Sequence, residues 1–282
     1  MLGPVWTELV ALAAAYVIAV IGTPAGISGA VLLLPFQVSV LGTPSPAVTP
    51  TNLLYNVVAT PGALFRYWRQ RQTGGRLAGV LIAGTVPGVI AGSVIRVELL
   101  PGGHLFDYVV AAVLLPIGVW LAVSRPPAKA AQEPAAAAAP PASRELRSAA
   151  GQRPGLGMRS AAWLIALSVV VGCVGGIYGI GGGSILAPVL IGTGRRPADV
   201  APAALASTFV TSVAGVITFA LLSLQHHGPV APDWPTGIAL GLGGLAGAYT
   251  GARIQSRLPE AAIRRLVGVL VIAIGARYAL FA

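Results

Sequence analysis

The chain has 282 residues, of which 55% are hydrophobic and only 9% are charged, and its formal net charge is +10. Soluble globular domains carry about 25% charged residues, so this composition excludes an ordinary soluble domain. Several charge-free windows reach the roughly 20 residues that cross a bilayer, and we expect a multi-pass helical protein of the cell inner (plasma) membrane. We interpret the positive charge as cytoplasmic arginines that set topology, not as a nucleic-acid surface.

Ten apolar segments separated by turn residues predict ten transmembrane helices. In the first half they span about 5–22, 26–42, 46–66, 77–97 and 104–123. In the second half they span about 160–178, 180–193, 198–224, 235–254 and 261–282. The intervening stretch is rich in Ala, Pro and Arg and has too little apolar variety to pack, so it predicts a disordered cytoplasmic linker. The predicted organisation is a first transmembrane repeat (1–123), the linker (124–159) and a second transmembrane repeat (160–282).

Basic residues predict how the two halves are oriented. Most of them lie in four groups: after the third helix, in the linker, after the seventh helix, and between the ninth segment and the tenth. If every helix spans the membrane, all four groups face the cytoplasm. Each half then has five helices, so the halves enter the membrane in opposite senses as an inverted repeat. If the short second and seventh segments are re-entrant instead, the last basic group falls on the other side, and we therefore favour ten spans.

The second and seventh segments share a glycine-containing pattern that ends in proline. The seventh reads Gly-Ile-Gly-Gly-Gly-Ser-Ile-Leu-Ala-Pro at 179–188, and the second reads Gly-Ile-Ser-Gly-Ala-Val-Leu-Leu-Leu-Pro at 26–35. Gly92 and Gly251 also match between the halves. Glycine and proline both interrupt helices, and backbone groups freed in lipid need a partner from protein, water or ligand. We therefore predict a broken, cavity-lining helix in each half, which is typical of transporter sites.

Together with Ala-Pro-Ala-Ala-Leu-Ala-Ser-Thr at 201–208, this duplicated motif resembles the TauE/SafE family of membrane proteins, the sulfite and organosulfonate anion exporters. The resemblance covers both halves and leaves out the linker. It implies transport of a small anion, although members of the family differ in substrate. The first copy departs from the pattern, because Ser28, Gly29 and Ala30 stand where the second copy has three glycines.

Candidate binding residues are neutral, because no Asp, Glu, Lys or His lies in the middle of a predicted helix. We expect no fixed cation at that depth. Small hydroxyl and amide side chains, together with backbone N–H groups at broken helix starts, suit an anion. The predicted substrate-binding residues are Ser28, Gly29, Asn52, Asn56, Gly181, Gly182, Gly183, Ser184, Ser207 and Thr208. Close helix packing is an alternative role for each Ser and Thr. Gln37 is expected either to bind substrate or to cap the carbonyl that Pro35 frees.

The sequence therefore predicts a secondary transporter, and specifically an exporter, of sulfite or a short organosulfonate, working by alternating access around a midplane site. We expect no metal, no cofactor and no enzyme activity. A passive anion channel is one alternative. An intramembrane serine hydrolase is another, because Gly-Ile-Ser-Gly at 26–29 matches its motif, but a nucleophilic serine needs a base and none is predicted within the membrane. The expected partners are a small inorganic or organosulfur anion and the lipid bilayer; the oligomeric state, a homodimer included, stays open.

Overall fold

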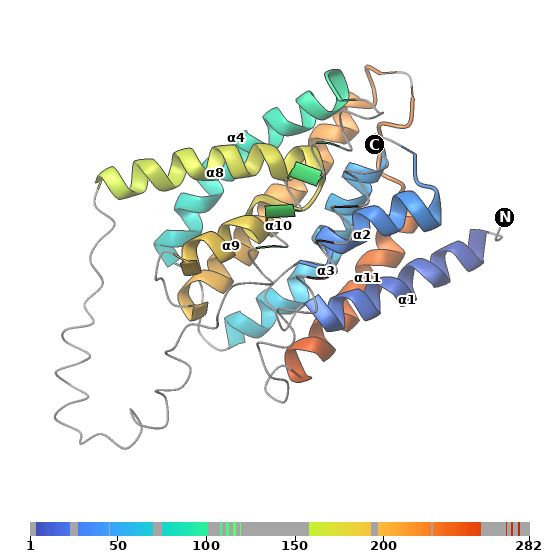
Figure 1. Cartoon of the computed structure of the whole chain (residues 1–282), viewed down its shortest axis with the longest axis horizontal. Coiled ribbons are helices and arrows are strands. Elements are labelled where there is room, and N and C mark those ends of the chain that lie inside the picture. The colour runs from blue at the N-terminus through green and yellow to red at the C-terminus, as the bar shows by residue number, and fades with distance from the viewer. Residues whose placement is uncertain are drawn as a thin grey trace.

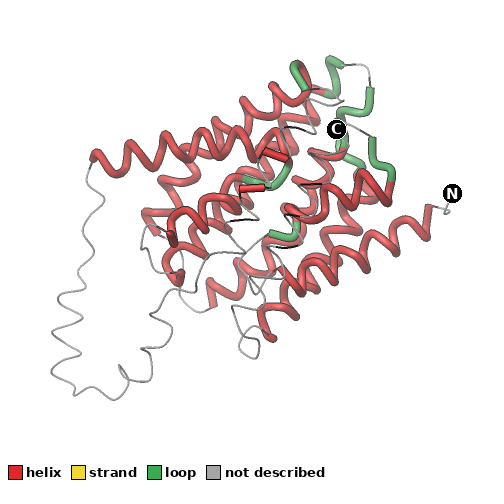
Figure 2. The backbone as a smooth tube through the Cα atoms, viewed as in Figure 1, coloured by secondary structure: helices red, strands yellow, loops and turns green. Residues whose placement is uncertain are grey.

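The computed structural model of the chain describes residues 4–22, 28–44, 46–69, 75–100, 158–192, 197–226 and 228–254, with single positions at 108, 111, 112, 115, 116, 119, 269, 272 and 276. Every regular element among them is helical (Figure 2), as the predicted all-α class requires. In chain order the elements are α1 (Pro4–Gly22), α2 (Ala30–Phe36), the π-helix η2 (Gln37–Leu41), α3 (Val48–Arg69), α4 (Gly75–Glu98), α8 (Met158–Tyr178), α9 (Gly182–Gly192), α10 (Pro197–Leu222) and α11 (Trp234–Ile254).

These bounds lie within a few residues of eight of the ten predicted helices. Two differences concern helix starts and geometry. The second predicted helix is α-helical only from Ala30 and changes to a π-helix after Pro35, and α8 already begins at Met158, inside the predicted linker. Most of the linker and of the predicted helices at 104–123 and 261–282 lie outside the described residues.

The helices of the two halves pack mainly against each other. The most extensive packing is between α4 and α8 and between α1 and α11, and both pairs lie against each other in Figure 1. Helix α10 packs on both α3 and α4, while α11 packs on α3. These contacts join a helix before the linker to one after it, so the described helices form one interleaved bundle.

In each of the two most extensively packed helix pairs, a row of glycines lets the two backbones approach closely. On α4, a Cβ at Gly84, Gly88 or Gly92 would meet the carbonyl oxygens of Ile165, Val169 and Cys173 on α8. On α11, a Cβ at Gly243, Gly247 or Gly251 would meet those of Leu12, Tyr16 and Val20 on α1. Small residues at every fourth position are how membrane helices bring their backbones together. The same packing device therefore occurs once in each half of the sequence.

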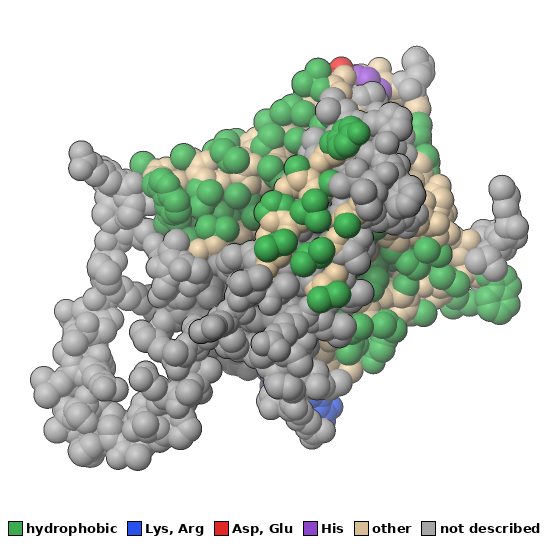
Figure 3. Space-filling view, in the orientation of Figure 1, with side chains coloured by type: hydrophobic (Ala, Val, Ile, Leu, Met, Phe, Trp, Pro, Cys, Tyr) green, Lys and Arg blue, Asp and Glu red, His purple; other side chains and the backbone are tan. Residues whose placement is uncertain are grey.

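The described surface is apolar along the helices and charged near their ends. Large hydrophobic side chains such as Trp6, Val170 and Ile217 are exposed. Figure 3 shows hydrophobic side chains over much of the described part of the face in view. Helices Gly75–Glu98 and Pro202–Leu222 are long and apolar enough to cross a bilayer. The apolar stretches Trp6–Ile21, Ala30–Leu41 and Ala162–Tyr178 are shorter. The ten-span arrangement stays a prediction.

Candidate functional site

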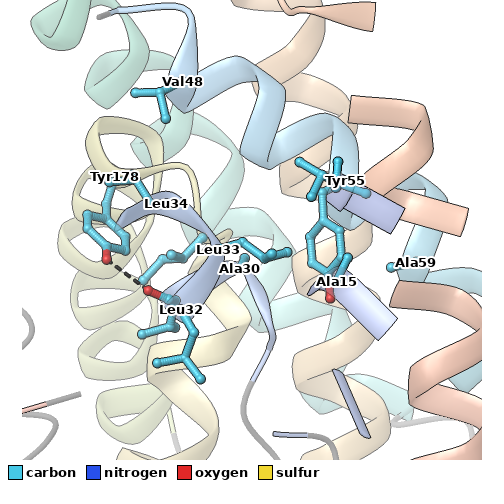
Figure 4. Close-up of a cluster of buried hydrophobic side chains, with 13 residues drawn as sticks. Ala15, Ala30, Leu32, Leu33, Leu34, Val48, Tyr55, Ala59 and Tyr178 are labelled. Atoms are coloured by element: carbon cyan, nitrogen blue, oxygen red, sulfur yellow. Dashed lines mark hydrogen bonds between the residues drawn. The ribbon is translucent and has the colours of Figure 1, made fainter. Parts of the chain in front are cut away.

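The first helix break is held by a residue from the second half of the chain. Pro35 lies inside α2 and has no N–H to donate to Val31 O, four residues earlier. Tyr178 Oη donates to that carbonyl instead, at 3.0 Å, as the dashed line in Figure 4 shows. Gln37, one of whose expected roles was to cap this carbonyl, points elsewhere: its Nε2 donates to Asn52 Oδ1 at 3.2 Å.

Asn52 joins α2 to the start of α3. Its Nδ2 donates to Ala30 O at 2.9 Å while its Oδ1 accepts from Gln37, and the side chain is completely buried. Both ends of this amide therefore contact protein. Substitution of Asn52 removes these packing hydrogen bonds in addition to any contact with a ligand.

The turn before α2 packs against the next polar residue of α3. Ser28 Oγ accepts from the backbone N–H of Ala30 at 3.2 Å and donates to Asn56 Oδ1 at 2.9 Å. A Cβ at Gly29 would collide with Tyr55 Oη, so only glycine fits that close approach. An asparagine amide is not a base, so this serine has no activating partner there of the kind that nucleophilic catalysis needs.

The second break is made by glycines in a left-handed conformation. Gly179 has φ +82° and Gly181 has φ +70°, values that favour glycine, and α9 begins directly afterwards at Gly182. A Cβ at Gly179 would meet Thr49 O on α3, and one at Gly183 would meet Ala204 O on α10. The break thus lies against helices from both halves.

Contacts around the two breaks correspond position by position in the repeated pattern. In the first half, Ser28 hydrogen-bonds to Asn56. At the matching positions of the second half, Gly181 lies against Thr208. Likewise, the contact of Asn52 with Ala30 corresponds to that of Ala204 with Gly183. Each break therefore packs on the N-terminal half of the long helix that follows it, α3 or α10.

The predicted site residues accordingly fall into two clusters. The cluster around α2 contains Ser28, Gly29, Asn52 and Asn56. The cluster around the start of α9 contains Gly181, Gly182, Gly183, Ser207 and Thr208. Ser184 turns back, because its Oγ donates to Ile180 O at 3.2 Å. Sequence reasoning missed Thr85 on α4, which lies against Gly182 and whose Oγ1 is 2.9 Å from Ser207 Oγ.

A buried arginine, which sequence reasoning did not consider for the site, lies near the end of α4. Arg96 is completely buried, and its Nε donates to Thr49 Oγ1 at 3.2 Å. Thr49 Oγ1 in turn donates to Ile177 O at 3.1 Å, so the guanidinium is linked to the residues just before the second break. The prediction that no fixed cation lies in the middle of a helix is not tested by Arg96, which lies in the last turn of α4. A buried positive charge near the start of α3 favours an anion in this region.

Some buried polar atoms near the two breaks have no hydrogen-bond partner among the described residues. They include Gln37 Oε1 and Asn56 Nδ2 beside α2 and Ser212 Oγ beside Gly181. Each such atom costs about 1–3 kcal/mol relative to a paired one. Native proteins contain few of them, and the ones near the breaks can hydrogen-bond a ligand or an ordered water.

The histidine that the structure describes, His226, is paired with a carboxylate. Its Nε2 lies beyond the end of α10 and is 2.9 Å from Oε1 of Glu98, the last residue of α4, and both side chains are partly exposed. Among the described residues, no group of three or more His, Cys, Asp or Glu side chains could hold a metal ion.

Comparison with known proteins gives a family for the chain. The family model described as "Sulfite exporter TauE/SafE" matches residues 11–278. The protein named "Probable membrane transporter protein YunE" from Bacillus subtilis (strain 168) is 31% identical over 112 residues, which is 39% of this chain and 38% of that relative. No solved structure matches the chain.

Proposed function

Because the chain belongs to the sulfite exporter TauE/SafE family and is a membrane transporter protein by that membership, we propose that it is a secondary transporter of a small sulfur-containing anion. The substrate class is sulfite or a short organosulfonate, moved outwards across the inner membrane. Alternating access takes place around the two helix breaks. The binding residues are those of the two clusters, with Arg96 added as the nearby positive charge.

The observation that carries this proposal is the correspondence between the breaks. In both halves the break packs against the N-terminal half of the following long helix, through the matching contacts of Ser28 with Asn56 and of Gly181 with Thr208. Repeated halves with paired broken helices are how many secondary transporters build a site near the bilayer midplane. The glycine rows on α4 and α11 support the same relation between halves. We propose that ten spanning helices form an inverted repeat around this centre.

The chemistry of the region supports an anion as cargo. Hydroxyl and amide groups such as Asn56 Nδ2, Ser212 Oγ and Thr208 Oγ1 can donate hydrogen bonds to it. The first N–H groups of α9, at Gly182 and Gly183, have no intrahelical acceptor and lie at the positive end of the helix dipole. Arg96 adds a full positive charge behind Thr49.

Purified protein in proteoliposomes tests the proposal. Labelled sulfite outside should enter faster when unlabelled sulfite is trapped inside, because an alternating-access carrier exchanges substrate across the membrane. A channel gives no such acceleration. If neither sulfite nor 2-hydroxyethanesulfonate moves under any imposed gradient, the proposed function is wrong.

A glycine substitution tests the location of the site. A Cβ at Gly182 would lie 2.6 Å from Thr85 Cγ2, so Gly182→Leu forces the second break and Thr85 apart and should abolish exchange. Gly79→Leu is the matched control, because a Cβ at Gly79 meets nothing within 4 Å. Equal exchange by two well-folded variants would place the substrate away from the second break.

A further inference from the structure

Two buried amides flank Asn52, and each leaves one atom without a hydrogen-bond partner among the described residues. These atoms are Gln37 Oε1 and Asn56 Nδ2, in side chains that are 0% and 1% exposed. Asn52 and Asn56 are one helical turn apart on one face of α3, where side chains start on the order of 5–6 Å apart. Because Gln37 is bonded to Asn52, both unpaired atoms belong to one short polar row.

Backbone contacts fix which atom of Gln37 is unpaired. A carbonyl only accepts, so the Asn52 atom that faces Ala30 O must be the Nδ2 donor. Asn52 Oδ1 then faces Gln37 and requires a donor, which is Gln37 Nε2 at 3.2 Å. The atom left over is Gln37 Oε1, an acceptor.

In Asn56 the unpaired atom is a donor and not an acceptor. The Ser28 hydroxyl, which accepts from the N–H of Ala30, donates its own hydrogen to Asn56 Oδ1. The unpaired atom is therefore Asn56 Nδ2, which carries two N–H donors. The row thus offers a donor at one end and an acceptor at the other.

We infer that this row selects a monoanion carrying an O–H group beside its charged oxygens. The charged oxygens accept from Asn56 Nδ2, and the O–H donates to Gln37 Oε1. The O–H form of hydrogen sulfite and a hydroxyl-bearing alkanesulfonate both satisfy this pattern, whereas the sulfite dianion and a plain alkanesulfonate leave Gln37 Oε1 unpaired. A site built to hydrogen-bond a substrate hydroxyl strongly rejects the analogue that lacks it. This inference rests on the proposed function and refines its substrate class.

Two ligands that differ by one hydroxyl provide the test. Ethanesulfonate and 2-hydroxyethanesulfonate carry the same charged group, so their ratio of inhibition of labelled sulfite exchange isolates the O–H contact. We expect 2-hydroxyethanesulfonate to inhibit exchange at a concentration about tenfold or more below that of ethanesulfonate. The loss of a contact to a buried polar group costs a binding free energy that corresponds to a ratio of this size. Equal inhibition overturns the inference while the proposed transport stands. Absence of any exchange overturns both.

A variant assigns the preference to Gln37. Gln37→Lys keeps a donor for Asn52 Oδ1 but has no acceptor, so the inhibition ratio should fall to about one. Asn56→Leu, which removes the donor to the shared sulfonate group, should weaken both ligands and keep the ratio. A Gln37→Lys protein that keeps the full preference shows that Gln37 is not the acceptor and overturns the inference. If either variant fails to fold, the comparison of the two ligands on the unaltered protein still decides.

Discussion

Tyr178 is the residue whose removal should most directly test how the first break is stabilised. Its hydroxyl donates at 3.0 Å to Val31 O, the carbonyl that would accept from residue 35 if that residue were not proline. Tyr178→Phe deletes this one oxygen and leaves the ring in the apolar cluster of Figure 4. The substitution should therefore change hydrogen bonding with little change in packing.

The expected cost follows from burial. Tyr178 is completely buried and Val31 is 2% exposed, so no water replaces the lost donor at the carbonyl. Leaving a buried acceptor unpaired costs about 1–3 kcal/mol. Equilibrium unfolding of the purified protein in mixed micelles should show a loss of this size. Tyr249→Phe is the matched control, because it deletes the same atom from a side chain that is 62% exposed and should change stability by less than about 0.5 kcal/mol.

A double-mutant cycle with Pro35→Ala isolates the cause. Alanine at position 35 restores an N–H that can donate to Val31 O within the helix. In that background Tyr178→Phe should cost less, with a coupling of about 0.5–3 kcal/mol between the two positions. An unchanged cost would refute the reasoning, because it would mean that the tyrosine does not replace the donor that proline lacks.

Three further predictions follow from the packing and the topology. Gly88→Leu on α4 and Gly247→Leu on α11 should each destabilise the bundle by about 1–3 kcal/mol or more, because each side chain would strike the backbone of the partner helix. Gly79→Leu, measured by the same unfolding assay, should not destabilise it. Asn52→Ala should lower the unfolding free energy by about 1–3 kcal/mol in addition to weakening sulfite exchange, because Gln37 Nε2 and Ala30 O both lose a partner; unchanged stability would contradict the contacts around α2. In a Cys173→Ala background, cysteines at Arg76 and Gly228 should react with a membrane-impermeant reagent from opposite sides, and reaction from the same side would contradict the ten-span arrangement.

The sequence predicted the described helices well because their length and apolar content are local properties. It also predicted where the helices break, since glycine and proline act on the backbone of their own segment. The match between Gly92 and Gly251 pointed to a relation between the halves, but the full glycine rows became evident only once α4 was seen against α8 and α11 against α1. A search of the sequence for glycine at every fourth position of these helices would have found the two rows.

The contacts that complete the site could not be predicted in the same way. Nothing in the segment that contains Tyr178 indicates that its hydroxyl reaches Val31 across the halves. Arg96 lies near the end of an apolar helix, where an arginine usually faces the membrane surface, and its burial depends on Thr49 from another helix. Such partners are set by tertiary packing, which has no local pattern in the sequence.

The hydrogen bonds between the breaks also imply how the two halves are coupled. Tyr178, at the end of α8, caps the carbonyl freed in α2, while Thr49, at the start of α3, accepts from Arg96 and donates to Ile177 O on α8. The first break is therefore held by the residues that directly precede the second break. Gln37 and Asn56 are buried, so the proposed binding of substrate there requires a helix around them to move. A movement of α2 away from α8 loses the Tyr178 contact, and one of α3 loses the Thr49 contact. Exposure of the first break would consequently alter the support of the second, which is a linkage between the two halves of the kind that the proposed alternating access requires.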